Sequence, residues 1–236
     1  MEITQLYEIL RSIHGPCGKW WPGSAEEVLI SAVLTQNTSW ANVEKALDKI
    51  RIKFLGDSDG FNGNSLKTLS VLSDDELREL IKPAGFFNVK TKRVRNLLNW
   101  ISKYNFDMDA VRKKAQDEVG LKELRNELLS VNGIGKETAD SILCYGLDLP
   151  VFVVDAYTKR LINRIFAIES SEIADYDSVQ QMFESSYPRD VEIYQELHGL
   201  IVEHSKVYCR SKPKCDECPL KDCRYKNTTF VEQKNA

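Results

Sequence analysis

The sequence predicts an all-α protein, and three observations support this prediction. Apolar residues recur at helical spacing in nearly every segment of the chain. Groups of Gly, Pro, Asn and Asp separate these segments from one another. The one run that resembles a strand, Val151 to Val154, stands alone between helical patterns and is too short to build a sheet. We therefore expect a fold in which helices pack only on helices.

The predicted helices follow one another along the chain. Residues 1–15 form an amphipathic helix whose acidic residues stand where a signal peptide would be basic. Ser24 is the expected N-cap of the next helix. Residues 56–65 are rich in Gly, Asn and Asp and are predicted to be a loop. The remaining helices are expected at residues 25–35, 42–54, 74–81, 91–104, 121–130, 136–145, 155–165, 176–186 and 191–205.

The composition is that of a soluble globular protein. Of the 236 residues, 42% are hydrophobic and 28% are charged. No apolar run approaches the roughly 20 residues that span a bilayer, so we expect a cytoplasmic protein without membrane partners. The net charge of -3 argues weakly against nucleic acid. Basic groups at residues 90–95, 112–114 and 206–226 nevertheless allow one basic face on a mildly acidic protein.

A glycine-bounded turn divides two helical patterns in the middle of the chain. Residues 121–130 are helix formers, Asn132-Gly133-Ile134-Gly135 breaks the helix, and Lys136 begins another. Two glycines this close allow a tight turn and a close approach of another group to the backbone. They also leave the first N–H groups of the second helix available at its positive end. The turn is either a phosphate site or an ordinary helical hairpin.

Four of the six cysteines lie in one short segment near the C-terminus. Cys209, Cys215, Cys218 and Cys223 form a C-x5-C-x2-C-x4-C pattern. In a chain without a secretion signal, this density indicates a metal site and not disulfides. The long outer spacings favour a [4Fe–4S] cluster, with a tetrahedral zinc ion as the alternative. His204 is interpreted as an ordinary helix residue.

Several segments together resemble the helix-hairpin-helix DNA glycosylases of the endonuclease III superfamily. The resemblance lies in the hairpin GIGKETA, the segment VVDAYTKRLINR after it and the terminal cysteines. It extends through LISAVLTQNTSWANVEKAL at residues 29–47 and IKPAGFFNVKTKRVRNLL at residues 81–98. It therefore covers most of the chain in the same order.

The resemblance implies two helical lobes with DNA bound in the cleft between them. Residues 18–149 would form a helical barrel that ends in the hairpin, and residues 1–17 with 150–236 would form the second lobe. The partner would be double-stranded DNA with a damaged base, bound by a monomer in the nucleoid. Asp155 matches the family's catalytic aspartate, and Gln36 matches a glutamine that fills the gap left by a flipped base. The expected DNA contacts are Gln36, Asn37, Gly133, Gly135, Lys136 and Thr138.

The chemistry of base removal fits these roles. A stacked base cannot be attacked in place, so such an enzyme extrudes the nucleotide at a cost of a few kcal/mol. Breaking the N-glycosidic bond builds positive charge on the sugar, which a carboxylate such as Asp155 stabilises. Members that also cut the backbone carry a lysine before the TA of the hairpin helix, where this chain has Glu137. Since a carboxylate cannot form an imine, we expect base release without efficient strand cleavage.

Three tryptophans indicate the kind of base. Trp20 and Trp21 precede a Pro-Gly turn and Trp40 ends the segment QNTSW; both segments resemble the 3-methyladenine glycosylase branch of the family. Indole rings attract a cationic alkylated purine, so these residues are the expected base pocket. Core filling is the structural alternative. Two other functions stay open: a glycosylase for oxidised or mismatched bases, and a DNA-binding module without catalysis.

Overall fold

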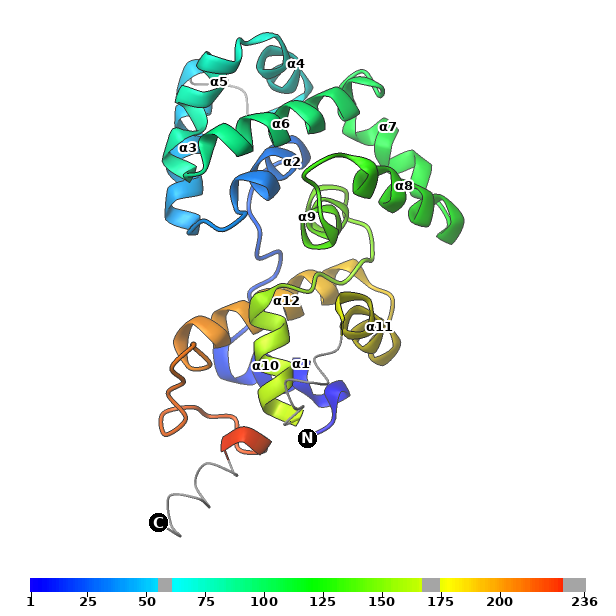
Figure 1. Cartoon of the computed structure of the whole chain (residues 1–236). Helices are drawn as coiled ribbons and strands as arrows, with labels where there is room; N and C mark the ends of the chain where they lie inside the picture. Colours follow the sequence, from blue (N-terminus) through cyan, green and yellow to red (C-terminus); the bar gives the residue numbers. More distant parts are fainter. Residues whose placement is uncertain (55–60, 167–174, 227–236) are drawn as a thin grey trace. The chain divides into compact units, whose positions relative to one another are not determined.

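The computed structural model describes residues 1–54, 61–166 and 175–226 of the chain. Every regular element in these ranges is helical, so the all-α prediction is confirmed (Figure 1). The chain forms two compact units. The central unit comprises residues 22–149, and the terminal unit combines residues 1–21 with residues 150–236. Within the described ranges, every helix is too short or too polar to cross a lipid bilayer.

The central unit is built around one buried helix, α2. Ser24 caps it, as expected, by accepting a hydrogen bond from the N–H of Glu27, and nearly all of its residues are buried. The other helices of the unit pack around α2 or around one another. Their bounds are α2 Ala25–Leu34, α3 Trp40–Phe54, α4 Gly63–Val71, α5 Asp74–Ile81, α6 Phe87–Ser102, α7 Met108–Arg112, α8 Glu118–Ser130 and α9 Lys136–Ser141.

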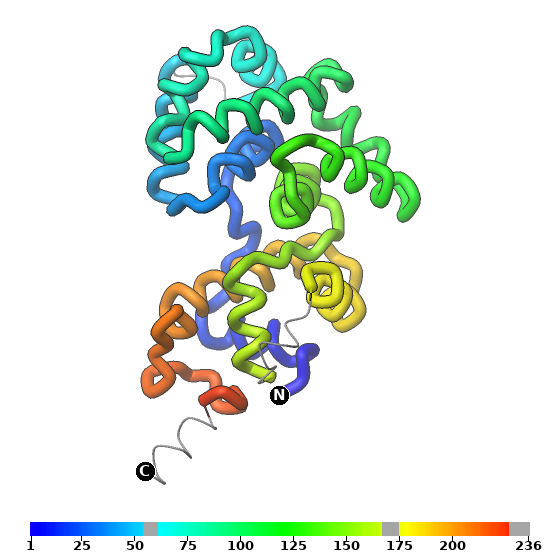
Figure 2. The backbone as a smooth tube through the Cα atoms, in the orientation of Figure 1, coloured from blue at the N-terminus to red at the C-terminus, as the bar shows by residue number. Residues whose placement is uncertain are grey.

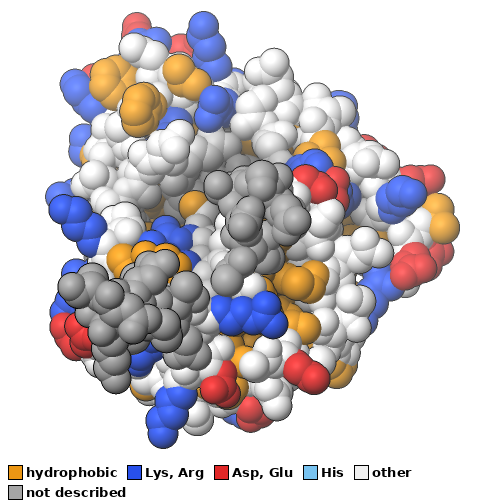
Figure 3. Space-filling view, turned by 60° about the horizontal axis from the view of Figure 1, so that its bottom comes forward, with side chains coloured by type: hydrophobic (Ala, Val, Ile, Leu, Met, Phe, Trp, Pro, Cys, Tyr) orange, Lys and Arg blue, Asp and Glu red, His pale blue; other side chains and the backbone are white. Residues whose placement is uncertain are grey.

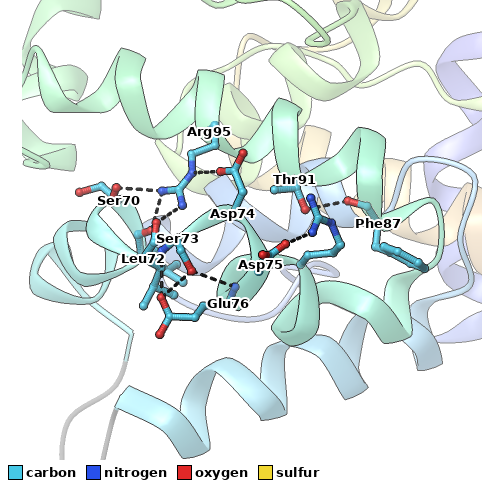
Figure 4. Close-up of polar contacts among 11 residues, drawn as sticks. Ser70, Leu72, Ser73, Asp74, Asp75, Glu76, Phe87, Thr91 and Arg95 are labelled. Carbon is cyan, nitrogen blue, oxygen red and sulfur yellow. Dashed lines mark hydrogen bonds and ion pairs between the residues drawn. The ribbon is translucent and has the colours of Figure 1, made fainter.

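Arg95 of α6 fixes the junction between α4 and α5 (Figure 4). Its guanidinium donates to the Asp74 carboxylate at 2.9 Å and to the Ser70 carbonyl at 2.8 Å. Ser73 and Glu76 form a capping box that begins α5. The chain therefore turns sharply here because side chains satisfy the exposed backbone groups at both helix ends.

The prediction of a loop at residues 56–65 is wrong in part. Asn62 caps α4 by accepting hydrogen bonds from the N–H groups of Asn64 and Ser65, so residues 63–65 are helical. Residues 55–60 lie outside the described residues. The composition misled the prediction because Asn is a frequent turn residue and also a strong N-cap. The short helix α7 was not predicted either.

The terminal unit joins both ends of the chain. The 3-10 helix Ile3–Gln5 leads into α1 Leu6–His14, and α10 Ala156–Phe166, α11 Tyr176–Ser186 and α12 Val191–Val207 complete the unit. Helix α1 packs beside α12, which follows it by almost the whole length of the chain (Figure 2). This pairing brings the segment after α1, including Trp20 and Trp21, into the terminal unit. The expected boundary at residue 18 therefore differs from the observed one by these few residues.

Residues 151–154 are extended and buried but form no strand. The N–H of Phe152 donates to the Glu184 carboxylate at 2.9 Å, and its carbonyl accepts from the Gln180 side chain at 2.7 Å. The Phe152 ring stacks on Phe183 with 4.1 Å between centroids. Side chains of α11 thus make the backbone hydrogen bonds that a neighbouring strand would make. They fix the chain just before Asp155.

Candidate functional site

The hairpin of the central unit is held by a buried ion pair. Asp140 in α9 is fully buried, and Arg125 in α8 donates to its two oxygens at 2.7 and 2.9 Å. Such a bidentate pair fixes both distance and orientation. After α9 the backbone widens into the π-helical segment Ile142–Gly146, which packs against α2. The hairpin is therefore anchored from both of its helices.

The two glycines of the turn have different roles. Gly133 has φ +92°, and a Cβ there would lie 2.4 Å from Cγ of Arg93, so no other residue fits without strain. Gly135 is exposed and is the N-cap residue of α9, with no side-chain cap. A Cβ added to Gly135 would meet no described atom within 4 Å. The backbone at the start of α9 is therefore exposed and is not covered by a side chain at Gly135.

Gln36 is joined to this turn. Its amide nitrogen donates to the Gly133 carbonyl at 3.1 Å and to the Thr138 hydroxyl at 2.9 Å. Arg93 donates to its amide oxygen at 2.5 Å. Gln36 is half-buried, and Asn37 beside it is exposed with φ +52°. The structure therefore brings together Gln36, Gly133 and Thr138, three of the expected DNA contacts. Gln36 holds the turn in place through its hydrogen bonds.

A buried lysine ties two further turns to each other. Lys90 is 1% exposed and donates to the carbonyls of Leu34 at 2.7 Å and Ala84 at 2.8 Å, and to the Thr38 hydroxyl at 2.6 Å. Burial and the nearby Arg93 lower the pKa of Lys90 to about 8. Three oxygen acceptors saturate the ammonium, which stabilises its charged form. The lysine fixes the turn that carries Asn37 against the turn that precedes α6.

That second turn carries an exposed aromatic ring. Phe86 has φ +45° and is 69% exposed. A bulky residue in the left-handed region is uncommon, and exposure of its ring adds an unfavourable solvation term. Strain of this kind concentrates at functional sites. Sequence analysis did not identify Phe86 or Lys90 as site residues; the aromatic directly after a helix-ending Gly was the available signal.

In the terminal unit, Asp155 stands at the start of α10. Its carboxylate oxygen Oδ1 accepts from the N–H of Thr158 at 2.7 Å and from the Thr158 hydroxyl at 2.9 Å. Its second oxygen, Oδ2, lies 3.6 Å from Nε2 of His198 in α12. Burial raises the pKa of Asp155, but the His198 and Thr158 contacts outweigh it and leave the pKa below the ordinary value. Asp155 is thus both the helix cap and an ionised, largely buried carboxylate.

The tryptophans are divided between the two units. Trp20 is half-buried in the terminal unit, and Trp21 beside it is 6% exposed. Trp20 meets the His198 ring edge to face at 6.0 Å between centroids, and its indole N–H donates to Glu203 at 2.9 Å. Trp40 is the first residue of α3 in the central unit. Trp20 therefore shares an environment with Asp155 through His198.

The comparisons with known proteins decide the family. Residues 30–189 match the HhH-GPD superfamily of base excision DNA repair proteins. The chain belongs to this superfamily. The match covers more than half of the chain and includes the hairpin and Asp155. The chain is a DNA N-glycosylase, as the sequence predicted.

Individual relatives agree with this assignment. A Methanocaldococcus jannaschii protein with the provisional name DNA repair glycosylase is 46% identical, over 93% of this chain and 94% of its own length. Endonuclease III of Thermotoga maritima is 26% identical over 83% of this chain and 80% of its own. The crystal structure of H. pylori 3-methyladenine DNA glycosylase bound to 1,N6-ethenoadenine superposes with a TM-score of 0.73 and 31% identity. It covers 87% of this chain and 98% of that one.

The first turn of α9 carries position 137, where the resemblance implies a lysine in strand-cleaving members. Glu137 is exposed, and Lys136 before it is half-buried. Neighbouring helix residues are rotated by about 100°, so Lys136 cannot replace a lysine at position 137. The exposed side chain at this position is a carboxylate, as the sequence indicated.

Two of the four cysteines, Cys209 and Cys223, contact Arg164 of α10. Its guanidinium lies 3.3 Å from Sγ of Cys209, and its carbonyl accepts from the Cys223 thiol at 3.5 Å. Burial, together with the nearby Cys209 and Cys223, raises the pKa of Cys215 and of Cys218. In residues 1–54, 61–166 and 175–226, no three His, Cys, Asp or Glu side chains are close enough to hold a single metal ion. The four thiols are therefore neighbours without forming a one-ion site.

Charged side chains are spread over the glycosylase's surface. Figure 3 shows Lys and Arg at several separate places on the face that it draws, with acidic side chains among them. In the cysteine segment Lys214 pairs with Glu217 at 3.0 Å. DNA contacts are therefore expected from local groups of cations and backbone N–H groups, in keeping with the small net charge.

Proposed function

We propose that this glycosylase hydrolyses the N-glycosidic bond of an alkylated purine, 3-methyladenine in particular, in double-stranded DNA and leaves the backbone uncut. The observation that carries the proposal is the environment of Asp155. The carboxylate is ionised, 12% exposed at its side chain, and adjacent through His198 to the indole of Trp20. It thus combines a fixed negative charge with a neighbouring aromatic surface.

Asp155 acts on the sugar of the flipped nucleotide. As the glycosidic bond breaks, positive charge develops on the sugar, and a carboxylate held by fixed hydrogen bonds stabilises it without reorganisation. A water molecule then attacks the sugar carbon, and its proton can pass to the carboxylate. The low pKa of Asp155 keeps the carboxylate ionised at neutral pH, so the group is ready for this step.

The substrate class follows from charge. An alkylated purine carries a positive charge, which weakens its glycosidic bond and reduces the need for an acid to protonate the leaving base. A cation over an indole gains about 0.5–2 kcal/mol. The Trp20 indole already carries one cation, because Nζ of Lys206 lies 4.8 Å from its centroid. The 31% identity to the H. pylori 3-methyladenine glycosylase supports the same class. Trp21, next to Trp20 in the same unit, extends the proposed aromatic surface for the base.

The central unit would hold the DNA while the base is out of the stack. The N–H groups at Gly135 and Lys136, on the turn braced by Gln36, are the proposed phosphate contacts. Asn37 would contact the strand from the neighbouring turn. The exposed ring of Phe86 can insert between bases, as apolar wedges do in other DNA-bending proteins. Phosphate contacts and stacking together offset the few kcal/mol that base extrusion costs.

Strand cleavage is not part of the proposed reaction. It would require an amine that forms an imine with the sugar and then promotes elimination of the 3′ phosphate. Glu137 supplies no amine at that position of the hairpin. The product is therefore an intact strand with an abasic site.

A panel of duplexes with single defined lesions tests the proposal. Each duplex carries 3-methyladenine, an oxidised pyrimidine or a mismatched base, and each reaction is divided and analysed with and without alkali. We expect base release from the 3-methyladenine duplex only, and strand breaks only after alkali. Release of oxidised or mismatched bases would favour the other glycosylase function. Binding without release of any base would favour a DNA-binding module.

We also propose that Cys209, Cys215, Cys218 and Cys223 hold a [4Fe–4S] cluster. The four cysteines lie in one short segment with outer spacings longer than those of a paired CxxC zinc site, and metal ligation would remove the unfavourable burial of their charge. A bound cluster would cross-link residues 209–223 to one another, next to Arg164 of α10. Iron analysis and a broad visible absorbance of the purified protein test this assignment, and zinc without iron would replace it.

A further inference from the structure

The two oxygens of Asp155 have different partners. Oδ1 accepts both hydrogen bonds from Thr158, which belong to the cap of α10. Oδ2 faces Nε2 of His198 at 3.6 Å, just beyond hydrogen-bond distance, and this contact lowers the pKa of Asp155. The cap therefore fixes Oδ1, while His198 lies beside Oδ2, the oxygen that we assign to the reaction.

The His198 ring is locked in place. It is 2% exposed, and it packs edge to face against Trp20 and against Phe152, with 6.0 and 6.5 Å between centroids. Trp20 in turn lies directly on α12, since a Cβ at Gly199 would be 2.4 Å from the Trp20 Cβ. Because aromatic rings close it in on two sides, the imidazole cannot swing away from Asp155 without repacking the unit.

The other charged groups near this pair have partners of their own. In α12, Glu203 binds the Trp20 indole and Lys206, the latter at 3.0 Å. In α11, Glu184 accepts from the backbone of Phe152. Lys159 of α10 lies over the Tyr176 ring, 5.8 Å from its centroid. His198 is thus the group placed to act on Asp155 Oδ2.

We infer that His198 is a positioning residue for the proposed base release: it fixes the Asp155 carboxylate with Oδ2 turned away from the helix cap. This inference rests on the proposed function. The histidine itself forms no bond to the substrate. Its effect passes through the carboxylate, whose burial would otherwise favour the protonated, inactive form.

The test compares His198→Leu and His198→Gln with the wild-type full-length protein. Base release is measured under single-turnover conditions across pH, and DNA affinity is measured separately. We expect His198→Leu to slow release by about 100-fold, the loss typical of a misplaced catalytic group. DNA affinity should stay within about twofold, because His198 is buried. The acid limb of the rate profile should move to higher pH, since the pKa of Asp155 rises without the imidazole.

His198→Gln separates orientation from charge. Its amide can donate to Oδ2 but carries no charge, so we expect part of the rate to return while the acid limb stays displaced. His14→Gln, on α1 of the same unit, is the matched histidine control and should leave both unchanged. If the rate and the acid limb of His198→Gln equal those of the wild type, the inference is wrong, and this variant decides the matter even if His198→Leu does not fold.

A direct titration of the Asp155 carboxyl by NMR tests the inference about His198 separately from the proposed function. If the wild type releases no base from any duplex, the proposed function fails. A raised Asp155 pKa in the variants would still establish the His198 effect on the carboxylate. An unchanged Asp155 pKa would overturn the inference whatever the protein excises.

Discussion

Two aspartates at neighbouring elements of the chain have opposite environments. Asp140, in the hairpin, is fully buried, and one guanidinium binds both of its oxygens. Asp155, at the start of α10, is slightly exposed, and its own helix binds only one of its oxygens. A carboxylate with both oxygens paired can only hold the fold together. One with an oxygen left for a substrate can also do chemistry, and this difference separates the anchoring region from the reacting region.

The largest expected effect comes from Asp155→Asn. Asn is as good an N-cap as Asp, so the free energy of unfolding should change by less than about 0.5 kcal/mol. Base release should fall at least about 100-fold, because a neutral amide cannot stabilise the developing cation. Single-turnover release and DNA binding are measured on the same preparation. Release at the wild-type rate would show that Asp155 takes no part in the reaction, and the contrast with Asp140 would then be wrong.

Asp140→Asn should have the reverse effect: it should lower the stability of the protein and leave the rate of base release nearly unchanged. The change removes the charge that Arg125 binds in a partly buried position, and breaking one half of such a pair costs about 3–5 kcal/mol. Urea unfolding of the variant measures the loss. Protein that is still folded should release bases at close to the wild-type rate. A stable variant with slow chemistry would mean that the hairpin anchor also sets the reaction rate.

Sequence patterns predicted the helices well and the contacts poorly. Periodicity gave Tyr176–Ser186 with the bounds that the structure has, because one apolar face packs against the unit and the ends carry capping residues. It missed α4, whose start at Asn62 depends on which side chain caps the helix. The family resemblance pointed to Asp155 and the glycines. It did not point to His198, since a histidine within an apolar helix reveals its partner only when α12 is placed beside α10.

The expected boundary at residue 149 coincides with that of the compact units, and the one at residue 18 differs from it by residues 18–21 for a related reason. Residues 18–21 follow α1 directly, and composition gave no sign of where they pack. Trp20 reaches α12 because Gly199 leaves room for the indole, a contact between residues almost the whole chain apart. Contacts at such separation leave no trace in local periodicity, so the sequence could not show how the tryptophans are distributed between the units.

The two hairpin glycines offer a smaller, internally controlled test. Gly133→Ala forces a side chain into the left-handed region and against Arg93, so we expect a loss of about 1–3 kcal/mol of stability. Gly135→Ala meets open space with φ -93°, so its stability should change by less than about 1 kcal/mol. Thermal unfolding of both variants gives the comparison. Equal losses would show that the turn is not set by the conformation of Gly133.

DNA affinity of the same pair then tests the phosphate contact. A methyl group at Gly135 stands beside the first N–H groups of α9, so Gly135→Ala should weaken binding several-fold while the fold stays intact. The loss should be equal for lesion and undamaged duplexes, because phosphate contacts carry no sequence information. A loss confined to lesion duplexes would instead indicate that the turn contacts the damaged nucleotide.

The smallest expected change is that of Glu137→Gln. If position 137 contributes no chemistry, removing its charge should leave base release unchanged and should strengthen DNA binding at most about twofold, because one surface charge near a phosphate is well screened. Neither this variant nor the wild type should be trapped on abasic DNA by borohydride, whereas Glu137→Lys supplies the amine that such trapping requires. Trapping of the wild type would show that another amine reaches the sugar. The separation between an anchoring hairpin and a reacting carboxylate would then no longer hold.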